Sequence, residues 1–175
     1  MSNIANKWWY YTPNLIDSIE GGDEYALLEK FKEKHYTKGV ADTVFNAVQD
    51  GMQAVMDFGT GSGFKIDGIT VCGKTGTVEN YDKGIKQKNH SFFGAFAPRE
   101  NPKIAIAVIC ENAGFGAAYS GPIASLLIEK YLRDSITRPQ AYMDRISNAS
   151  LLPAVARPIN KPKIDTLKAK LKAKR

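Results

Sequence analysis

The residues Gly68–Thr77 (Gly-Ile-Thr-Val-Cys-Gly-Lys-Thr-Gly-Thr) constrain the fold more than any other stretch of this chain. Four β-prone residues come first, and a lysine and two threonines, spaced by glycines, follow them. This order predicts a strand that stays extended to its end and presents a positive charge and hydroxyl groups there. The glycines remove side-chain bulk, so that another backbone or a carboxylate can lie against the strand. The stretch therefore predicts a strand edge that binds an anionic group.

The same residues also satisfy the phosphate-loop pattern G-x-x-x-x-G-K-[ST], from Gly68 to Thr75. A phosphate loop follows a strand and opens a helix at its lysine, where it binds ATP with magnesium. Here the four residues between the glycines are themselves strand-like, and the residues after Lys74 carry no helical apolar stripe. The context disfavours this alternative, which requires a helix beginning at Lys74.

Two more apolar segments read as strands, residues 91–97 and residues 104–110, with a tight turn between Pro98 and Pro102. A fourth strand is predicted around Tyr10. Together with the strand around Lys74, these segments predict an α+β fold, in which helices pack against one antiparallel sheet built from all four strands.

Helix signals flank the strands. A helix is predicted over residues 43–57 with Asp42 as its N-cap, and a short one from Asp23 to about Lys34. Another begins near Tyr119, with Pro122 in its first turn. Its predicted buried stripe consists of apolar residues at helical spacing: Ile123, Leu126, Leu127 and Tyr131.

The segment Lys74-Thr75-Gly76-Thr77 is also the K-T-G element of serine acyl-transferases that react with penicillin. The segments 90–98, 101–112 and 114–124 follow it in the order of one such family, and 4–13 is similar to a segment that precedes them. Residues 1–137 thus resemble the last third of a class B penicillin-binding protein, nearest to the elongation-type penicillin-binding protein 2. The resemblance implies a partial penicillin-binding fold of the serine β-lactamase-like type.

The resemblance assigns roles along the K-T-G strand. Lys74, Thr75, Gly76 and Thr77 are the expected substrate-binding residues. Lys74 supplies positive potential, and the hydroxyls of Thr75 and Thr77 bind the substrate carboxylate. The backbone N–H of Thr77 forms half of the oxyanion hole, so Lys74 and Thr77 are also the expected catalytic residues. The strand edge is expected to pair with the peptide backbone.

Two other motifs of this chemistry, S-x-x-K and S-x-N, carry the nucleophile and its proton shuttle. The sequence contains no S-x-N, and its one S-x-x-K, Ser62 to Lys65, lies among glycines where a helix starts poorly. The part of the family that carries these motifs is therefore expected to be absent, and the chain alone is expected to have no transpeptidase turnover.

A non-catalytic module that binds peptides or β-lactams remains an alternative. A partly exposed hydrophobic face and marginal stability are expected.

Charge divides the chain in two. Residues 157–175 contain eight Lys or Arg and a single Asp, so the net charge of +6 lies in a tail and the rest is close to neutral. This distribution disfavours nucleic-acid binding. Residues 1–137 are predicted to be the transpeptidase portion, and residues 138–175 a basic, largely disordered tail with a short amphipathic piece at 140–147.

The remaining expectations concern partners and location. The resemblance implies peptidoglycan stem peptides and β-lactams as ligands, other cell-elongation proteins as partners, and a place on the periplasmic side of the cytoplasmic membrane. The sequence itself shows no membrane span, metal-ligand spacing or cofactor motif. Cys72 and Cys110 lie in apolar strands and are predicted to be buried thiols, and His90 is predicted to be structural.

Overall fold

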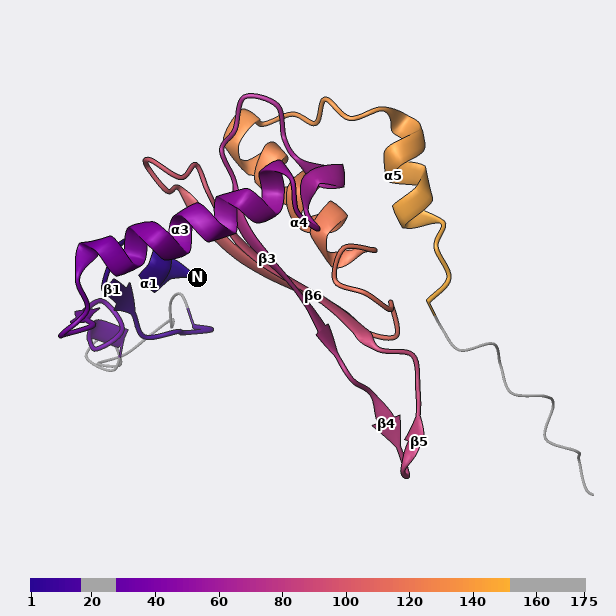
Figure 1. The fold of residues 1–175 in the computed structure, drawn as a ribbon, viewed down its shortest axis with the longest axis horizontal. Coiled ribbons are helices and arrows are strands. Elements are labelled where there is room, and N and C mark those ends of the chain that lie inside the picture. Colours follow the sequence, from indigo (N-terminus) through magenta and orange to yellow (C-terminus); the bar gives the residue numbers. More distant parts are fainter. Residues whose placement is uncertain (17–27, 152–175) are drawn as a thin grey trace, which may run out of the picture.

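The computed structural model describes residues 1–16 and 28–151. Its centre is an antiparallel three-stranded sheet with strand order β3-β6-β7 (Figure 1). These strands are β3 (Cys72–Val78), β6 (His90–Ala97) and β7 (Ile104–Cys110). In register, Thr75 lies opposite Phe93, which in turn lies opposite Val108. The three strands predicted around Lys74, Phe92 and Ile104 are confirmed.

The central strand β6 is apolar on both faces, which explains its uninterrupted hydrophobic sequence. On one face Phe93 packs with Phe64, Ile66 and Ile128 in the main core cluster. On the other face Phe96 packs in a smaller cluster with Cys72, Met52 and Ala5. Helices cover both faces, which gives the α+β architecture that the sequence predicts.

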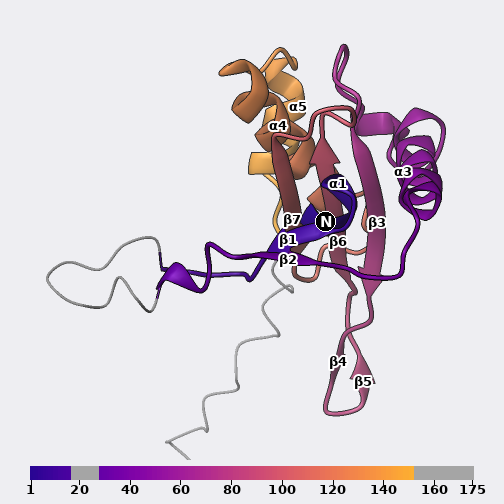
Figure 2. The same ribbon diagram turned by 90° about the vertical axis from the view of Figure 1, so that its left-hand side faces the viewer.

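The helix α3 (Asp42–Asp57) runs beside β3 (Figures 1 and 2). It confirms the predicted helix, but its N-cap is Ala41 and no side chain caps it. Asp42 is therefore the first helical residue rather than the cap, where its negative charge still favours the positive end of the helix dipole.

The helix α4 (Ser120–Arg133) packs across β6 and β7. The predicted stripe is wrong at Leu127 and Tyr131, whose side chains are 50% and 63% exposed. Small residues are buried instead, because the 3₁₀ turn after α3 places the Phe64 ring so close to the helix that a Cβ on Gly121 would lie 2.3 Å from it. The buried residues of α4 are Ser120, Gly121, Pro122, Ala124, Ser125, Ile128 and Glu129.

The strand β1 (Trp9–Tyr11) pairs with β2 (Lys34–Tyr36) in a separate two-stranded sheet, next to the short α1 (Ser2–Ala5). The prediction that the Tyr10 strand joins the main sheet is therefore wrong. Cross-strand contacts hold it to β2, including the Lys34 ammonium 4.3 Å from the Trp9 ring. The helix predicted from Asp23 lies largely outside the described residues, and its predicted end at Lys34 is wrong because that residue begins β2.

Three smaller elements complete the described chain. A hairpin of β4 (Tyr81–Asp82) and β5 (Ile85–Lys86) extends the β3–β6 connection, turning through Lys83 and Gly84 at positive φ (Figure 1). The 3₁₀ turn η1 (Ser62–Phe64) follows α3, and α5 (Gln140–Ser147) confirms the predicted amphipathic piece. Across residues 1–16 and 28–151, every helix is too short or too polar to cross a membrane.

Apolar side chains remain exposed on several elements, and the expected partly exposed hydrophobic face stays a prediction. Ile109 at the end of β7 is 58% exposed, and Phe58 and Phe115 are exposed as well. Exposed apolar area of this kind contributes nothing to folding. The expected marginal stability stays a prediction.

Candidate functional site

The Lys74–Thr77 segment lies within β3, at one edge of the main sheet. Strand β6 pairs with one side of β3, and no described strand pairs with the other (Figure 2). Side chains alternate along a strand, so Thr75 and Thr77 share one face and Lys74 lies on the opposite face. The geometry is that of an open strand edge with hydroxyls on one side and a cation on the other.

The glycines of this strand are needed for close packing within the fold. A Cβ on Gly73 would lie 2.4 Å from the Phe93 ring, and a Cβ on Gly76 would lie 3.1 Å from the Phe92 ring. A Cβ on Gly116, in the segment before α4, would lie only 2.3 Å from the carbonyl oxygen of Gly76. The segment that leads into α4 therefore packs directly against the backbone of the K-T-G strand.

The Lys74 ammonium is exposed and has no acidic partner among the described ion pairs. Its Nζ donates a hydrogen bond to the carbonyl oxygen of Thr75 at 2.7 Å. An exposed cation that no carboxylate of the described chain neutralises keeps its positive potential for an anionic ligand.

A hydroxyl pair lies beside this edge. Thr60 Oγ1 is 2.8 Å from Thr75 Oγ1. Sequence reasoning missed Thr60, because it stands between two glycines in a segment that looks like a connector. Only the return of this segment to β3 brings the two hydroxyls together.

The Ser62–Lys65 match to S-x-x-K is engaged elsewhere. Lys65 Nζ forms an ion pair with Asp57 Oδ1 at 2.5 Å, and the hydrogen bonds from Lys65 and then Gln53 lower the pKa of Asp57. Ser62 begins only the three-residue 3₁₀ turn η1 and no α-helix. With its ammonium held by Asp57, Lys65 is poorly placed to activate Ser62.

The phosphate-loop alternative is wrong. Strand β3 continues through Lys74 and Thr75 to Val78, and Lys74 lies opposite Gly94 in the sheet. A phosphate loop would leave the strand before its lysine and begin a helix there.

The histidine and cysteines are parts of the framework. His90 Nδ1 accepts a hydrogen bond from the Asn112 backbone N–H at 3.0 Å, as expected of a structural histidine. Cys72 is fully buried, and burial raises the pKa of its thiol to about 11. Burial also raises the pKa of Cys110, which is only partly buried, so the buried-thiol prediction is confirmed for Cys72 alone.

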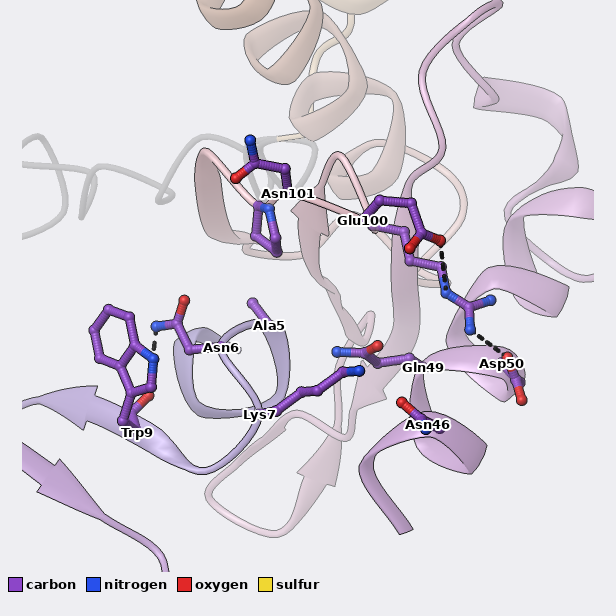
Figure 3. Close-up of a pocket in the computed structure, with 11 residues that line it drawn as sticks. Ala5, Asn6, Lys7, Trp9, Asn46, Gln49, Asp50, Glu100 and Asn101 are labelled. Carbon is purple, nitrogen blue, oxygen red and sulfur yellow. Dashed lines mark hydrogen bonds and ion pairs between the residues drawn. The ribbon is translucent and has the colours of Figure 1, made fainter. Parts of the chain in front are cut away.

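A pocket of about 800 Å³ lies away from the K-T-G strand, between α1, α3 and the turn after β6 (Figure 3). Its wall holds Arg99, whose guanidinium pairs with Asp50 at 2.5 Å and Glu100 at 3.7 Å. The hydrogen bond that Arg99 donates to the Asp50 carboxylate raises the pKa of Arg99. Arg99 is therefore neutralised by its two carboxylate partners, while Lys7, which lines the same pocket, has no acidic partner among the described ion pairs.

Comparison with known families decides the identity of the chain. Residues 1–129 match the family described as "Penicillin binding protein transpeptidase domain". The chain belongs to this family. The predicted resemblance to class B penicillin-binding proteins is thereby confirmed, together with the transpeptidase-type α+β fold.

Several members of the penicillin-binding transpeptidase family are similar to this chain. The peptidoglycan D,D-transpeptidase MrdA of Haemophilus influenzae is 30% identical over 156 residues, which are 79% of this chain and 23% of that protein. The peptidoglycan D,D-transpeptidase PbpA of Mycolicibacterium smegmatis is 30% identical over 138 residues, 76% of this chain and 28% of that protein. The chain thus spans about a quarter of the length of the curated relatives that it matches.

Solved structures of this family are also similar to the chain. Penicillin-binding protein A from M. tuberculosis, described as a ceftriaxone acyl-enzyme complex, matches with a TM-score of 0.60 and 27% identity, over 75% of this chain and 30% of that one. PBP2 of Pseudomonas aeruginosa in complex with WCK 5153 matches with a TM-score of 0.57 and 26% identity, over 77% and 28%.

Proposed function

We propose that residues 1–137 are the substrate-binding portion of a peptidoglycan D,D-transpeptidase domain, and that the β3 edge holds the carboxylate end of the stem peptide. The observation that carries this proposal is the open edge of β3, with an unneutralised Lys74 cation and two threonine hydroxyls. The names of the relatives, peptidoglycan D,D-transpeptidases, support the same substrate class.

The peptide binds by strand addition. Its extended backbone pairs with the free edge of β3, and the side chains of the strand provide specificity. Lys74 supplies positive potential, the hydroxyls of Thr75 and Thr77 donate to the terminal carboxylate, and Gly76 lets the backbone approach. The backbone N–H of Thr77 donates to the reacting carbonyl oxygen, where negative charge develops during acyl transfer. β-Lactams, which carry a carboxylate and an acyl carbonyl, bind the same edge.

The chain by itself binds without acylation. A covalent step needs an activated nucleophile, and the lysine of the sequence's one S-x-x-K is held by Asp57. In the complete activity, the β3 edge works together with nucleophile-bearing segments of the family, on the periplasmic side of the cytoplasmic membrane and alongside other cell-elongation proteins. Residues 138–175 form a basic tail outside the transpeptidase portion.

A paired titration tests substrate binding. N-acetyl-D-alanyl-D-alanine and its C-terminal amide differ only in the carboxylate charge. The chain is expected to bind the acid more tightly, and Lys74→Met to lower the affinity for the acid about 10- to 100-fold, because a hydrogen bond to a charged group contributes about 1.5–3 kcal/mol. The control Lys86→Met removes an exposed lysine of the hairpin and should leave both affinities unchanged. Equal affinities of the unmodified chain for acid and amide would contradict the proposal.

A labelled penicillin tests the covalent step. Intact-mass spectrometry of the chain after incubation is expected to show no adduct, while the labelled penicillin competes with the peptide for β3. An adduct on Ser62 would overturn the assignment of catalytic incompetence. Competition without an adduct, together with acylation of a longer protein that combines this sequence with an S-x-x-K and an S-x-N, supports the transpeptidase over the non-catalytic module.

A further inference from the structure

The hydroxyl of Thr60 contacts the K-T-G strand without belonging to its motif. We propose that Thr60 is a positioning residue of the carboxylate site: it donates its hydrogen to Thr75 Oγ1, 2.8 Å away, and thereby leaves the Thr75 hydrogen for the ligand carboxylate. This inference rests on the proposed function and names a further residue of the same site.

Either hydroxyl of the pair can be the donor, and hydrogen counting shows what each direction leaves for a ligand. Each threonine hydroxyl has one hydrogen to donate and two lone pairs to accept with, whereas a carboxylate only accepts. Of the two hydrogens in the Thr60–Thr75 pair, one is used between the hydroxyls and one remains. When Thr60 is the donor, the remaining hydrogen lies on Thr75, on the face that Thr75 shares with Thr77. Donation into Thr75 also polarises its O–H bond and strengthens the hydrogen bond to an anion.

The last turn of α3 holds the backbone around Thr60. The backbone N–H of Gly59 donates to the Ala54 carbonyl at 3.0 Å, and that of Gly61 donates to the Val55 carbonyl at 2.9 Å. A Cβ on Gly59 would lie 2.8 Å from Val55 Cα. Both neighbours of Thr60 are thus bound to the helix end and packed where no side chain fits.

The same helix turn is packed against β3, which fixes Thr60 relative to Thr75. Met56 Sδ would lie 2.6 Å from a Cβ on Gly61 and 3.1 Å from a Cβ on Gly73, so one side chain fills the space between the loop and the strand. Thr60 itself is exposed and makes no described contact with the core, so its side chain is not needed for folding. A well-held loop that carries an exposed hydroxyl to the carboxylate-binding residue is the arrangement expected of a positioning group.

The test is a double-mutant cycle of Thr60→Val and Thr75→Val, with the acid and amide peptides as ligands and NMR titration as the readout. Thr60→Val is expected to lower the affinity for the acid about 5-fold, since a neutral hydrogen bond contributes about 1 kcal/mol. It should leave the affinity for the amide unchanged, and Thr60→Ser should restore tight binding of the acid. The double variant should bind no more weakly than Thr75→Val alone, because Thr60 acts through Thr75.

Each other outcome overturns the inference in a distinguishable way. If the unmodified chain prefers the acid but Thr60→Val binds it equally well, Thr60 has no role while the proposed function stands. Additive losses in the double variant would make Thr60 a direct ligand contact instead of a positioning residue. If the unmodified chain does not discriminate acid from amide, the proposed function fails first and this inference fails with it. Circular dichroism melts of each variant identify any loss that comes from unfolding.

Discussion

The two edges of the main sheet have opposite chemistry. On the β3 edge, the segment Lys74–Thr77 presents a cation and two hydroxyls. On the β7 edge, residues Ile104–Cys110 include no charged or hydroxyl side chain. Natural edge strands usually carry charges, prolines or bulges that prevent unwanted pairing. Strand β3 is protected by its lysine and can bind an anionic peptide reversibly, whereas β7 has the composition of a strand that is paired permanently.

The residues packed around the two edge strands also differ. Ile109 on this strand is exposed, and so are Leu127 and Tyr131 on the helix α4 that packs across it. Around β3, by contrast, α3 and the Gly59–Gly61 loop are packed closely. Close packing therefore holds the loop beside the binding edge in place, while the apolar edge exposes Ile109.

The largest change in stability is expected when the side chain of Phe93, in the strand between the two edges, is removed. Phe93 is fully buried in the strand between β3 and β7 and packs edge-to-face on Phe64 at 5.1 Å. Phe93→Ala should lower the free energy of unfolding by about 3–5 kcal/mol, as large cavities in cores do. Urea denaturation measures it, with the exposed Phe115→Ala as the matched control, expected to change within about 0.5 kcal/mol. Equal effects of the two changes would contradict the assigned core.

A smaller change should affect the β3 edge alone. Gly116→Ala places a methyl group 2.3 Å from the Gly76 carbonyl oxygen and 2.7 Å from that of Phe92. Overpacking of this kind costs about 1–3 kcal/mol, and here it should also weaken binding of the acid peptide by shifting the K-T-G strand. Gly63→Ala is the control, since nothing lies within 4 Å of its Cβ position. An unchanged melting temperature and affinity in Gly116→Ala would argue against this packing.

Each edge strand carries a cysteine, and the two should respond differently to alkaline pH. Burial raises the pKa of Cys72, at the start of β3, from 9.0 to about 11. Because the folded pKa lies above the unfolded one, the associated stability is fully present below pH 9 and is lost as the pH rises toward 11. The unmodified chain should lose about 2 kcal/mol more than Cys72→Ala across this window. An equal loss of stability in the unmodified chain and in Cys72→Ala would contradict the burial of this thiol. Cys110→Ala, which removes the partly buried thiol of β7, is the control variant.

The smallest effect on folding is expected when a charge is added to β7. This change directly tests the difference between the polar β3 edge and the apolar β7 edge. Ala107 is exposed in the middle of this strand, opposite Gly94. Ala107→Lys should change the unfolding free energy by less than about 1 kcal/mol while reducing concentration-dependent self-association in sedimentation velocity. Ala141→Lys, at an exposed position of α5, adds the same charge away from β7 and should not reduce association. Binding of the acid peptide should be the same in all three proteins.

The sequence allowed the three main strands to be predicted, because β6 and β7 come from apolar runs and β3 follows a run of β-prone residues that begins at Ile69. It did not allow the partner of the Tyr10 strand to be predicted, since periodicity identifies a strand but not the distant segment with which it pairs. The prediction of the buried face of α4 was wrong for a different reason. Large apolar residues mark a buried face only where there is room for them, and here the Phe64 ring lies so close to Gly121 that no side chain fits.

The candidate site was predicted only in part. The lysine and threonines of K-T-G can be recognised along the sequence because they are adjacent. Thr60 could not be found in this way, since its role depends on a contact across 15 residues that forms when the loop after α3 folds back on β3. A hydroxyl between two glycines that are packed against a helix end is a signal that only a structure supplies.

The most direct test of the account follows the backbone amides of the chain by NMR during titration with N-acetyl-D-alanyl-D-alanine and then with its amide. The acid is expected to shift the resonances of Lys74 to Thr77 and of Thr60 at lower concentration than the amide does, while the resonances of β7 stay in place. Equal shifts by acid and amide, or shifts that occur on β7 and not on β3, would contradict the assignment of β3 as the carboxylate-binding edge.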